Sequence, residues 1–252
     1  MTSDSPTPPI TVLHREIPAL AGVNTYQHPQ MQFIYIEEGV LAVISEQGRY
    51  FVPPKQGIVI PAKCQHELIA KTSVKLTVLY FSETALSPET QENQQHIKVI
   101  TTSPLLSALI DESKLIAPDY HWDETEGRLL RLIRDKILTA AVLDTFLPYP
   151  KDPRLTNITN KLLKHPSLKS DLVSWGKFVK TSSRTLTRLF KKETDITYSE
   201  WRQRLNIQIA IKHLALGDSI NTIAALLGYE SSSAFIYMFK KQMHCSPNQF
   251  LS

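Results

Sequence analysis

The sequence predicts an α+β protein with two parts. The first is an antiparallel β-barrel or sandwich with an added pair of helices, and the second is all-α, with two helix-turn-helix units joined by a long helix. Three observations predict this arrangement. Short apolar runs alternate with turn residues up to about residue 81, helical periodicity replaces them after residue 154, and part of the helical region occurs twice.

Composition places the chain among ordinary globular proteins, because 42% of its 252 residues are hydrophobic. No apolar run reaches the roughly 18 residues that a membrane span needs, and residues 1–10 are polar and rich in proline. We therefore expect a disordered N-terminus, no membrane contact and a cytoplasmic location. Cys64 and Cys245 lack the spacing of a zinc site or a disulfide framework, so neither is expected.

The β region is expected to cover residues 11–95. Gly39, Gly48 and Gly57 lie nine residues apart, and each closes a run rich in Val, Ile, Tyr and Phe, which is the spacing of an antiparallel sandwich or barrel. Pro53 and Pro54 cannot donate hydrogen bonds within a central strand, so they mark an edge or a connection.

A helical region is expected at residues 96–146, with helices over residues 103–117 and 122–143. Its apolar stripe consists of Leu129, Leu132, Ile133 and Ile137, interrupted by Lys136. This pair can pack only within the chain or can also meet a second copy, and we favour a homodimer contact through residues 103–143. Three prolines in residues 147–153 predict a linker, and the second domain is expected at residues 154–252.

Positive charge is concentrated in the second domain. Residues 151–252 contain 16 Lys and Arg against 7 Asp and Glu, a net charge of +9, whereas the preceding residues carry 12 basic and 17 acidic residues, a net charge of −5. A basic domain attracts polyanions such as nucleic acid, although basic surfaces also suit membranes or solubility.

An internal duplication lies within this basic domain, with residues 179–192 repeated at residues 228–241 at a constant offset of 49. The aligned pairs are Ser182 with Ser231, Leu186 with Phe235, Leu189 with Met238, Phe190 with Phe239, Lys191 with Lys240, and Lys192 with Lys241. In each copy the serine can cap a helix, and three apolar residues at i, i+3 and i+4 form one buried face. The residues left facing outward are Ser183, Arg184, Thr187, Arg188 and Lys191 in the first copy, and Ser232, Ser233, Ile236, Tyr237 and Lys240 in the second.

A shorter helix precedes each copy and contains a small residue, Gly176 or Ala224, where two crossing helices approach. This pattern predicts two helix-turn-helix units in series; the alternative is an ordinary helical bundle with serine caps. The helix expected at residues 198–216 would span about 28 Å, which compares with the roughly 34 Å between successive major-groove faces of DNA.

The second half of the basic domain contains AIKHLALGDSINTIAALLGYESSSAFIYMFKKQMHCSP, residues 210–247, a long motif that resembles the AraC/XylS family of bacterial transcription regulators. The resemblance covers Asp152 to Phe250, and Trp175 and Trp201 resemble the branch with a cupin-like N-terminal sensor domain. The resemblance implies a transcription factor that binds double-stranded DNA and contacts RNA polymerase, and whose activity is regulated by a small-molecule effector or by dimerisation. The family usually has glycine after each recognition helix, whereas this chain has Asp195 and His244 at those positions. We therefore expect the family fold to be retained, with less stable helix ends.

The resemblance also implies that Ser182 to Glu193 and Ser231 to Gln242 enter the major groove. Arg188 is expected to read bases and Arg184 bases or phosphates, because arginine can bind guanine O6 and N7 together; for both, the alternative is a solvated helix charge. Ile236 can meet a thymine methyl and Tyr237 a base edge or phosphate, or both can be partly buried. The residues expected to contact the DNA backbone are Lys191, Lys192, Lys240 and Lys241.

The first domain resembles a cupin-like ligand-binding domain at His28, Gln30, Gln32 and His66. Metal-dependent cupins have a second histidine where this chain has Gln30, so we expect neither a metal nor another cofactor. These residues can line a small-molecule pocket, which we favour, or be structural, or hold a metal. The competing functions are a cupin-type metalloenzyme with an accessory DNA-binding domain and an architectural DNA protein; we expect no catalytic residues.

Overall fold

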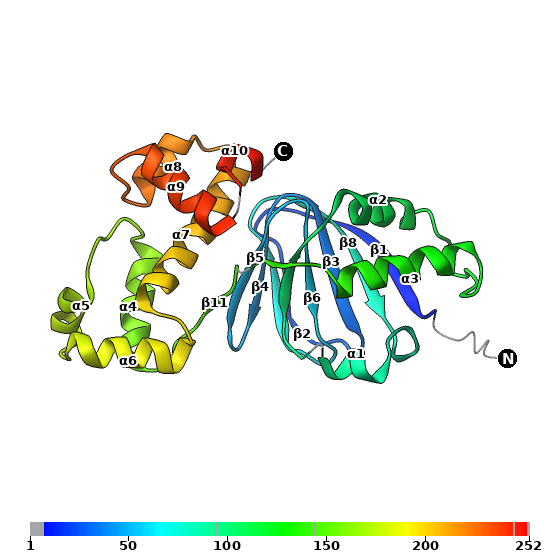
Figure 1. Ribbon diagram of the computed structural model, residues 1–252, viewed down its shortest axis with the longest axis horizontal. Helices are drawn as coiled ribbons and strands as arrows, with labels where there is room; N and C mark the ends of the chain where they lie inside the picture. The colour runs from blue at the N-terminus through cyan, green and yellow to red at the C-terminus, as the bar shows by residue number, and fades with distance from the viewer. Residues whose placement is uncertain (1–7, 94, 144, 244, 251–252) are drawn as a thin grey trace. The chain divides into compact units, whose positions relative to one another are not determined.

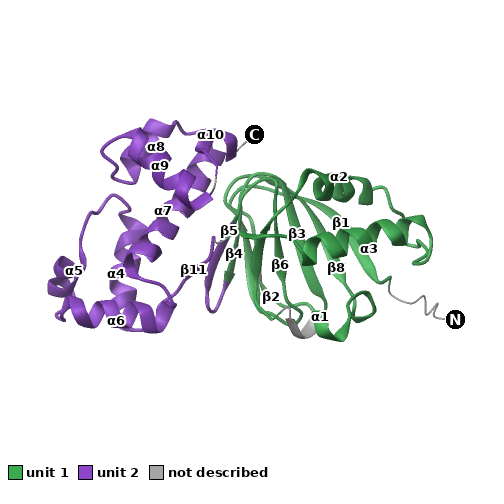
Figure 2. Cartoon of the chain, viewed as in Figure 1, with its two compact units in different colours: residues 1–44, 52–144 green, residues 45–51, 145–252 purple. Residues whose placement is uncertain are grey.

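The computed structural model describes residues 8–93, 95–143, 145–243 and 245–250, and it confirms the α+β class (Figure 1). The chain divides into two compact units, which Figure 2 colours separately. Unit 1 contains the described residues up to Ile44 and from Val52 to residue 143. Unit 2 contains Ser45–Phe51 together with the described residues from Thr145 onward.

Two antiparallel sheets form the β region. The first has the order β1 (Ile10–Ile17), β8 (Val74–Phe81), β3 (Met31–Glu38), β6 (Gln56–Ile60), β9 (Lys98–Thr101) and β10 (Val142–Leu143). The second has the order β11 (Leu147–Pro148), β5 (Gly48–Val52), β4 (Leu41–Ser45), β7 (His66–Ala70) and β2 (Gly22–Tyr26). The expected barrel is therefore a two-sheet sandwich and not a closed barrel, because each sheet keeps its own edge strands.

Two helices cover the first sheet, namely α2 (Pro104–Ser113) and α3 (Thr125–Leu138). Their buried residues pack on Phe33, Tyr35 and Leu79, which alternate with the residues that face the other way. The helix residues in this core are Leu106, Ile110, Leu130, Ile133 and Ile137. Ile133 and Ile137 were expected in the stripe, but Leu130 takes the place predicted for Leu132, whose side chain remains 41% exposed.

Several boundaries differ from those expected. β9 and β10 bring residues of the predicted helical region 96–146 into the first sheet, so the boundary after residue 95 does not separate two units. β11 lies within the predicted linker 147–153, and β1 begins at Ile10, inside the segment expected to be disordered. The rest of that N-terminal prediction falls on residues 1–7, which are outside the described residues. The polar segment before β9 contains the short helices η1 (Glu83–Ala85) and α1 (Pro88–Asn93).

Unit 2 contains the predicted series of helices and one short helix that the sequence did not indicate. They are α4 (Pro153–Lys164), α5 (Leu172–Phe178), α6 (Ser183–Thr194), α7 (Tyr198–Ala215), α8 (Ile220–Leu226), α9 (Ser232–Met243) and α10 (Pro247–Phe250). Trp175 and Trp201 belong to the buried core around α4, α5 and α6. The unexpected α10 packs on α9 through Phe250, whose ring centroid lies 5.4 Å from that of Phe239.

A buried glutamine fixes the position of the long helix α7 within unit 2. Gln208 is 0% exposed; its Oε1 accepts a hydrogen bond from Arg49 Nε at 2.7 Å, and its Nε2 donates to Thr145 O at 2.8 Å and to Arg49 O at 3.2 Å. The indole of Trp201 donates to Pro148 O at 2.9 Å. Residues 45–51 and 145–148 are therefore part of the packing of α7.

Among the described helices, none is both long and apolar enough to cross a membrane.

Candidate functional site

The first helix-turn-helix unit consists of α5 and α6. A Cβ atom on Gly176 would lie 2.6 Å from Thr181 O, so only glycine allows α5 to approach the turn this closely. The turn ends at Ser182, whose side chain accepts a hydrogen bond from Thr185 N at 3.1 Å and caps α6. Both features were expected from the sequence.

The second unit, α8 and α9, is built in the same way. Ala224 is buried at the crossing, and Ser231 Oγ accepts from Ala234 N at 3.2 Å. Gly228 precedes α9 with a φ of +77°, and a Cβ there would lie 2.7 Å from Ser167 O, so this turn also needs glycine. Ser232 donates a hydrogen bond to Asn221 Oδ1, which ties α9 to α8.

The two faces of each second helix are arranged as the duplication predicts. The buried face consists of Leu186, Leu189 and Phe190 in α6 and of Phe235, Met238 and Phe239 in α9. The exposed predicted contact residues are Ser182, Arg184, Thr187, Arg188, Lys191 and Lys192 in the first copy and Ser231, Ser233, Tyr237, Lys240 and Lys241 in the second. Ser183, Ser232 and Ile236 are half-buried, whereas Tyr237 is 72% exposed.

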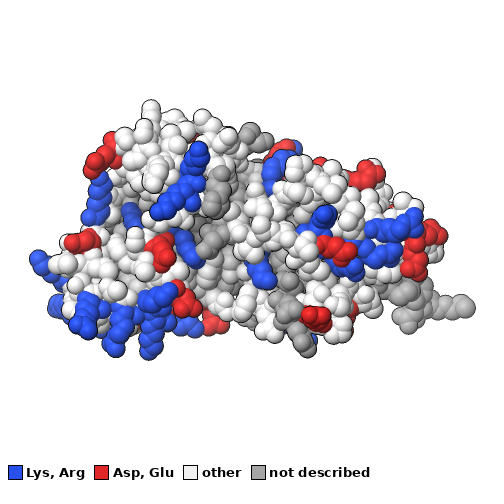
Figure 3. Space-filling view, viewed as in Figure 1, with Lys and Arg blue, Asp and Glu red and all other residues white. Residues whose placement is uncertain are grey.

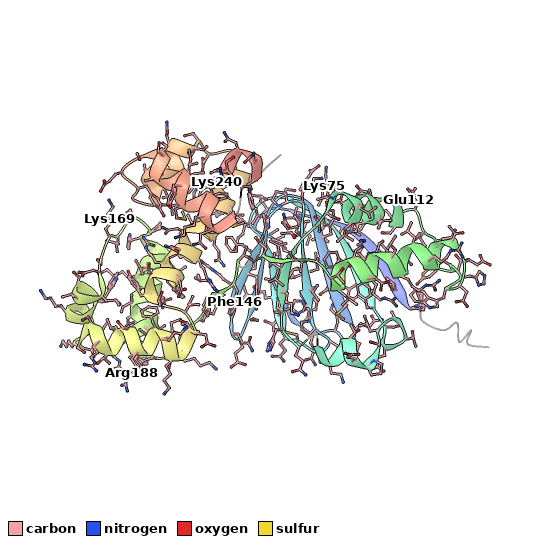
Figure 4. The ribbon with its side chains drawn as sticks, in the orientation of Figure 1. Lys75, Glu112, Phe146, Lys169, Arg188 and Lys240 are labelled. Atoms are coloured by element: carbon pink, nitrogen blue, oxygen red, sulfur yellow. The ribbon has the colours of Figure 1, made fainter. Side chains whose placement is uncertain are left out.

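Positive charge gathers on the open face of α6, and Figure 3 shows Lys and Arg along the edge where this helix lies. An open hollow of about 590 Å³ is lined by Arg184, Thr187, Arg188, Lys191 and Lys192. Arg188 projects from α6 away from the rest of unit 2 (Figure 4). In the part of the chain that is described, neither Arg184 nor Arg188 has an ion-pair partner, so both are available to an external anion.

The C-cap residue of α6 is Asp195, at the position where the family usually has glycine. Asp195 adopts the left-handed conformation with a φ of 60°, its N–H bonds to Lys191 O, and its own carbonyl accepts from Lys191 Nζ at 2.6 Å. The equivalent prediction for His244 falls outside the described residues.

The helix between the two units, α7, sets their separation. Thr197 and Glu200 form a reciprocal capping box at its start. Its 18 residues correspond to about 27 Å at 1.5 Å per residue. This length is of the same order as the roughly 34 Å between successive major grooves on one side of DNA.

A second candidate site lies between the two sheets of the sandwich. Tyr26 of β2 pairs directly with His66 of β7 in one sheet, and Gln32 of β3 pairs directly with Tyr80 of β8 in the other. The ring centroid of Tyr26 lies 4.5 Å from that of His66 and 4.8 Å from that of His28, which in turn lies 4.8 Å from Tyr80. The structure thus brings together three of the four residues predicted to bind a ligand.

The fourth, Gln30, lies apart from this cluster. It lines a separate hollow of about 210 Å³ with residues that include Met31, Lys63 and Phe81. Sequence reasoning missed Tyr26 and Tyr80; strand alternation, which places Tyr80 and Val78 on one face and Leu79 on the other, is the signal that could have found Tyr80.

Burial dominates the electrostatics of the cluster. It raises the pKa of Tyr26 to about 12 and lowers the pKa of His28 below its ordinary 6.5. The pKa of His66 is also lowered by burial, although the Cys64 carbonyl opposes that shift. Both imidazoles are therefore neutral at pH 7. Within the described ranges no three His, Cys, Asp or Glu side chains are grouped as metal ligands, and the His28 and His66 ring centroids lie 6.5 Å apart.

Two family models of known proteins match the chain, one over each of the regions that contain a candidate site. A family model described as an AraC-like ligand binding domain matches residues 16–142, half of the chain, and one described as a helix-turn-helix domain matches residues 175–252. The chain belongs to the AraC family. As an AraC-family regulator it binds DNA through its C-terminal helix-turn-helix domain and carries an N-terminal ligand-binding domain.

Curated relatives of this AraC-family chain are themselves regulators. It is 27% identical over 227 residues to the HTH-type transcriptional regulator NimR of Escherichia coli, covering 90% of this chain and 81% of NimR. It is 30% identical over 132 residues to the regulator RipA of Corynebacterium diphtheriae, covering 51% of this chain and 39% of RipA. Among solved structures, ToxT from Vibrio cholerae aligns with 97% of this chain and 98% of its own at 11% identity and a TM-score of 0.39.

Proposed function

We propose that this regulator reads an operator with α6 and α9 in two major grooves and that Arg188 is its principal base-reading residue. The observation that carries the proposal is Arg188, which has no ion-pair partner among the described residues and lies on the exposed face of a capped helix beside three other cations. A guanidinium held at such a position can donate two hydrogen bonds to guanine O6 and N7. Arg184 binds a base or a phosphate, and the lysines at the ends of α6 and α9 bind the DNA backbone.

The two units contribute unequally in this proposal. α6 offers two arginines to base edges, whereas α9 offers two serines, the half-buried Ile236 and the exposed Tyr237. Arginine forms the commonest base-specific contact in the major groove, whereas serine can hydrogen-bond to any of several bases and so discriminates less between them. The first helix-turn-helix, α5 and α6, therefore provides most of the sequence preference.

Regulation is assigned to unit 1. The cluster of His28, Gln32, His66 and their tyrosine neighbours binds a small-molecule effector, which shifts operator affinity or the contact with RNA polymerase. Exposed apolar residues on α2, on α3 and in the connection between them support a homodimer contact there: Leu105 is 51%, Leu115 80% and Leu132 41% exposed. The protein acts in the cytoplasm, and the proposal contains no catalytic step. Within the described residues, no group of three His, Cys, Asp or Glu side chains includes His28 and His66, and the proposal contains no metal.

A binding experiment with the full-length chain tests the role of Arg188. Binding sites are first selected from random double-stranded DNA, and the affinities of Arg188→Ala for a selected and a random duplex are then measured. Loss of a bidentate contact costs about 1–3 kcal/mol, so affinity for the selected duplex should fall about 5- to 150-fold. Affinity for random DNA should fall far less.

Lys164→Ala is the matched control, because it removes one exposed positive charge from α4, outside both helix-turn-helix units. It should change both affinities by the same small factor. Equal losses on selected and random DNA for Arg188→Ala would show that Arg188 binds phosphate and does not read sequence. A salt titration of each complex measures the backbone contribution independently.

A further inference from the structure

Two buried hydrogen-bond acceptors in the cluster of Tyr26, His28, Gln32, His66 and Tyr80 have no partner among the described residues. Gln32 and His66 are each 2% exposed, and Gln32 Oε1 and His66 Nε2 are both closed off from solvent without a hydrogen bond. Buried polar atoms are nearly always paired, because an unmade hydrogen bond leaves the cost of desolvation uncompensated. The two side chains come from opposite sheets, and both contact the side chain of Tyr26.

The remaining contacts determine the chemical character of each atom. His66 Nδ1 lies 2.9 Å from Cys64 O, and because a carbonyl oxygen only accepts, Nδ1 carries the imidazole proton. Nε2 of the neutral ring is then a lone-pair acceptor. Gln32 Nε2 donates to Tyr80 Oη at 3.2 Å, and Oε1 is the end of that amide left without a partner among the described residues. Both unpartnered atoms therefore require a donor.

Charge around the cluster is low. The rings in contact with His66 and Gln32 are those of two tyrosines and a neutral histidine. Arg15, exposed on β1, acts on the cluster through its charge, which lowers the pKa of Tyr80 against the larger rise caused by burial. A buried carboxylate or phosphate would face two lone pairs here with no cation in contact, which is unfavourable.

We propose that this cluster binds an uncharged small molecule that donates two hydrogen bonds from its own N–H or O–H groups, one to Gln32 Oε1 and one to His66 Nε2. The inference rests on the proposed function, in which unit 1 senses an effector, and it adds the chemical class of that effector. The half-buried rings of Tyr26, His28 and Tyr80 are the side chains that move to admit it. Anionic ligands are rejected.

Three planar probes of nearly the same size separate donor capacity from charge. Benzamide is neutral and has two N–H donors, nitrobenzene is neutral and only accepts, and benzoate is an anion and only accepts. Each is titrated into the full-length chain labelled with ¹⁵N-histidine, and the imidazole nitrogen resonances are followed. Benzamide should shift the His66 Nε2 resonance saturably, whereas nitrobenzene and benzoate should leave it unchanged.

Gln32→Met removes one acceptor and should weaken benzamide binding about fivefold, the worth of one neutral hydrogen bond. Gln65→Met is the control, because the side chain of Gln65 is exposed beside His66 in the chain, and it should leave the benzamide affinity unchanged. Equal binding of benzoate or nitrobenzene, no benzamide binding up to its solubility limit, or an unaltered Gln32→Met variant would each overturn the proposal.

DNA binding by the same preparations separates this inference from the proposed function. A chain that binds its selected duplex specifically but rejects benzamide refutes the ligand class alone. A chain that binds benzamide at His66 but prefers no duplex over random DNA refutes the proposed function alone.

Discussion

Replacing Gln208 with leucine tests whether one buried amide holds α7 in place. Leucine has a similar volume but forms no hydrogen bond, so Gln208→Leu would leave Arg49 Nε, Arg49 O and Thr145 O without their present partner. Each buried polar group left unpaired costs about 1–3 kcal/mol. Because the Arg49 side chain is only half-buried, we take the lower part of that range and expect a loss of about 3–5 kcal/mol in the unfolding free energy of unit 2. That is a large share of the 5–15 kcal/mol of a typical domain.

Urea unfolding followed by tryptophan fluorescence measures this loss. A Trp122→Phe background leaves Trp175 and Trp201 as the reporters, and both belong to unit 2. Linear extrapolation gives the unfolding free energy of each variant. Gln203→Leu is the matched control on the same helix, since half-buried Gln203 accepts one hydrogen bond, from Gln242 Nε2 at 2.9 Å, and its loss should cost less than about 1 kcal/mol.

The double variant with Arg49→Met adds a second check. Removing both partners of a hydrogen bond costs less than the two single losses together, so we expect a coupling energy of about 1–2 kcal/mol. If Gln208→Leu cost no more than Gln203→Leu, or if the two single losses simply added, the hydrogen bonds of Gln208 would not be what positions α7.

Two further predictions concern the turn of the first helix-turn-helix, α5 and α6, and the pH dependence of the stability of unit 1. Gly176→Ala should lower the unfolding free energy of unit 2 by about 1–3 kcal/mol in urea unfolding, because the new Cβ would lie 2.6 Å from a backbone carbonyl oxygen. Lys177→Ala, an exposed position on the same helix, is the control and should be near neutral. Equal stabilities of the two variants would show that α5 can shift to make room. Since burial lowers the pKa of His66 in the fold, the unfolded chain binds the proton first as pH falls below the ordinary 6.5, and unit 1 should lose stability from there towards the lower folded pKa. Unfolding curves measured at several pH values give the unfolding free energy of unit 1 as a function of pH. His66→Asn, which retains the neighbouring His28 and Tyr26, should make this free energy depend less on pH. An unchanged pH dependence would mean that His66 is not the titrating group.

The helical part of the fold could be predicted closely because its signals are local. Ser182 and Ser231 cap helices whose apolar faces follow within one turn, and Gly176 marks the crossing, so short stretches of sequence contain the whole pattern. The stripe on α3 was predicted less well. Leu130 and Leu132 are equally apolar, and only packing on the first sheet decides which of them is buried.

The features that the sequence did not reveal depend on contacts between distant residues. β10 has two residues and β9 four, too few for strand alternation to show, and each forms only by pairing with a partner strand. Gln208 meets Arg49 across 159 positions, and no local pattern indicates that residues 45–51 pack with α7. The cluster around His66 likewise depends on strand register, which brings Tyr26 and Tyr80 beside the predicted residues.

Methylation protection on a selected duplex tests most directly whether the two helix-turn-helix units act in series. Because the method reports guanine N7 in the major groove, each bound chain should protect two groove segments on one side of the DNA, with centres roughly one helical turn apart. Arg188→Ala should remove protection from the segment that α6 contacts and leave the other segment protected. A single protected segment per chain, or equal loss at both segments, would contradict the account.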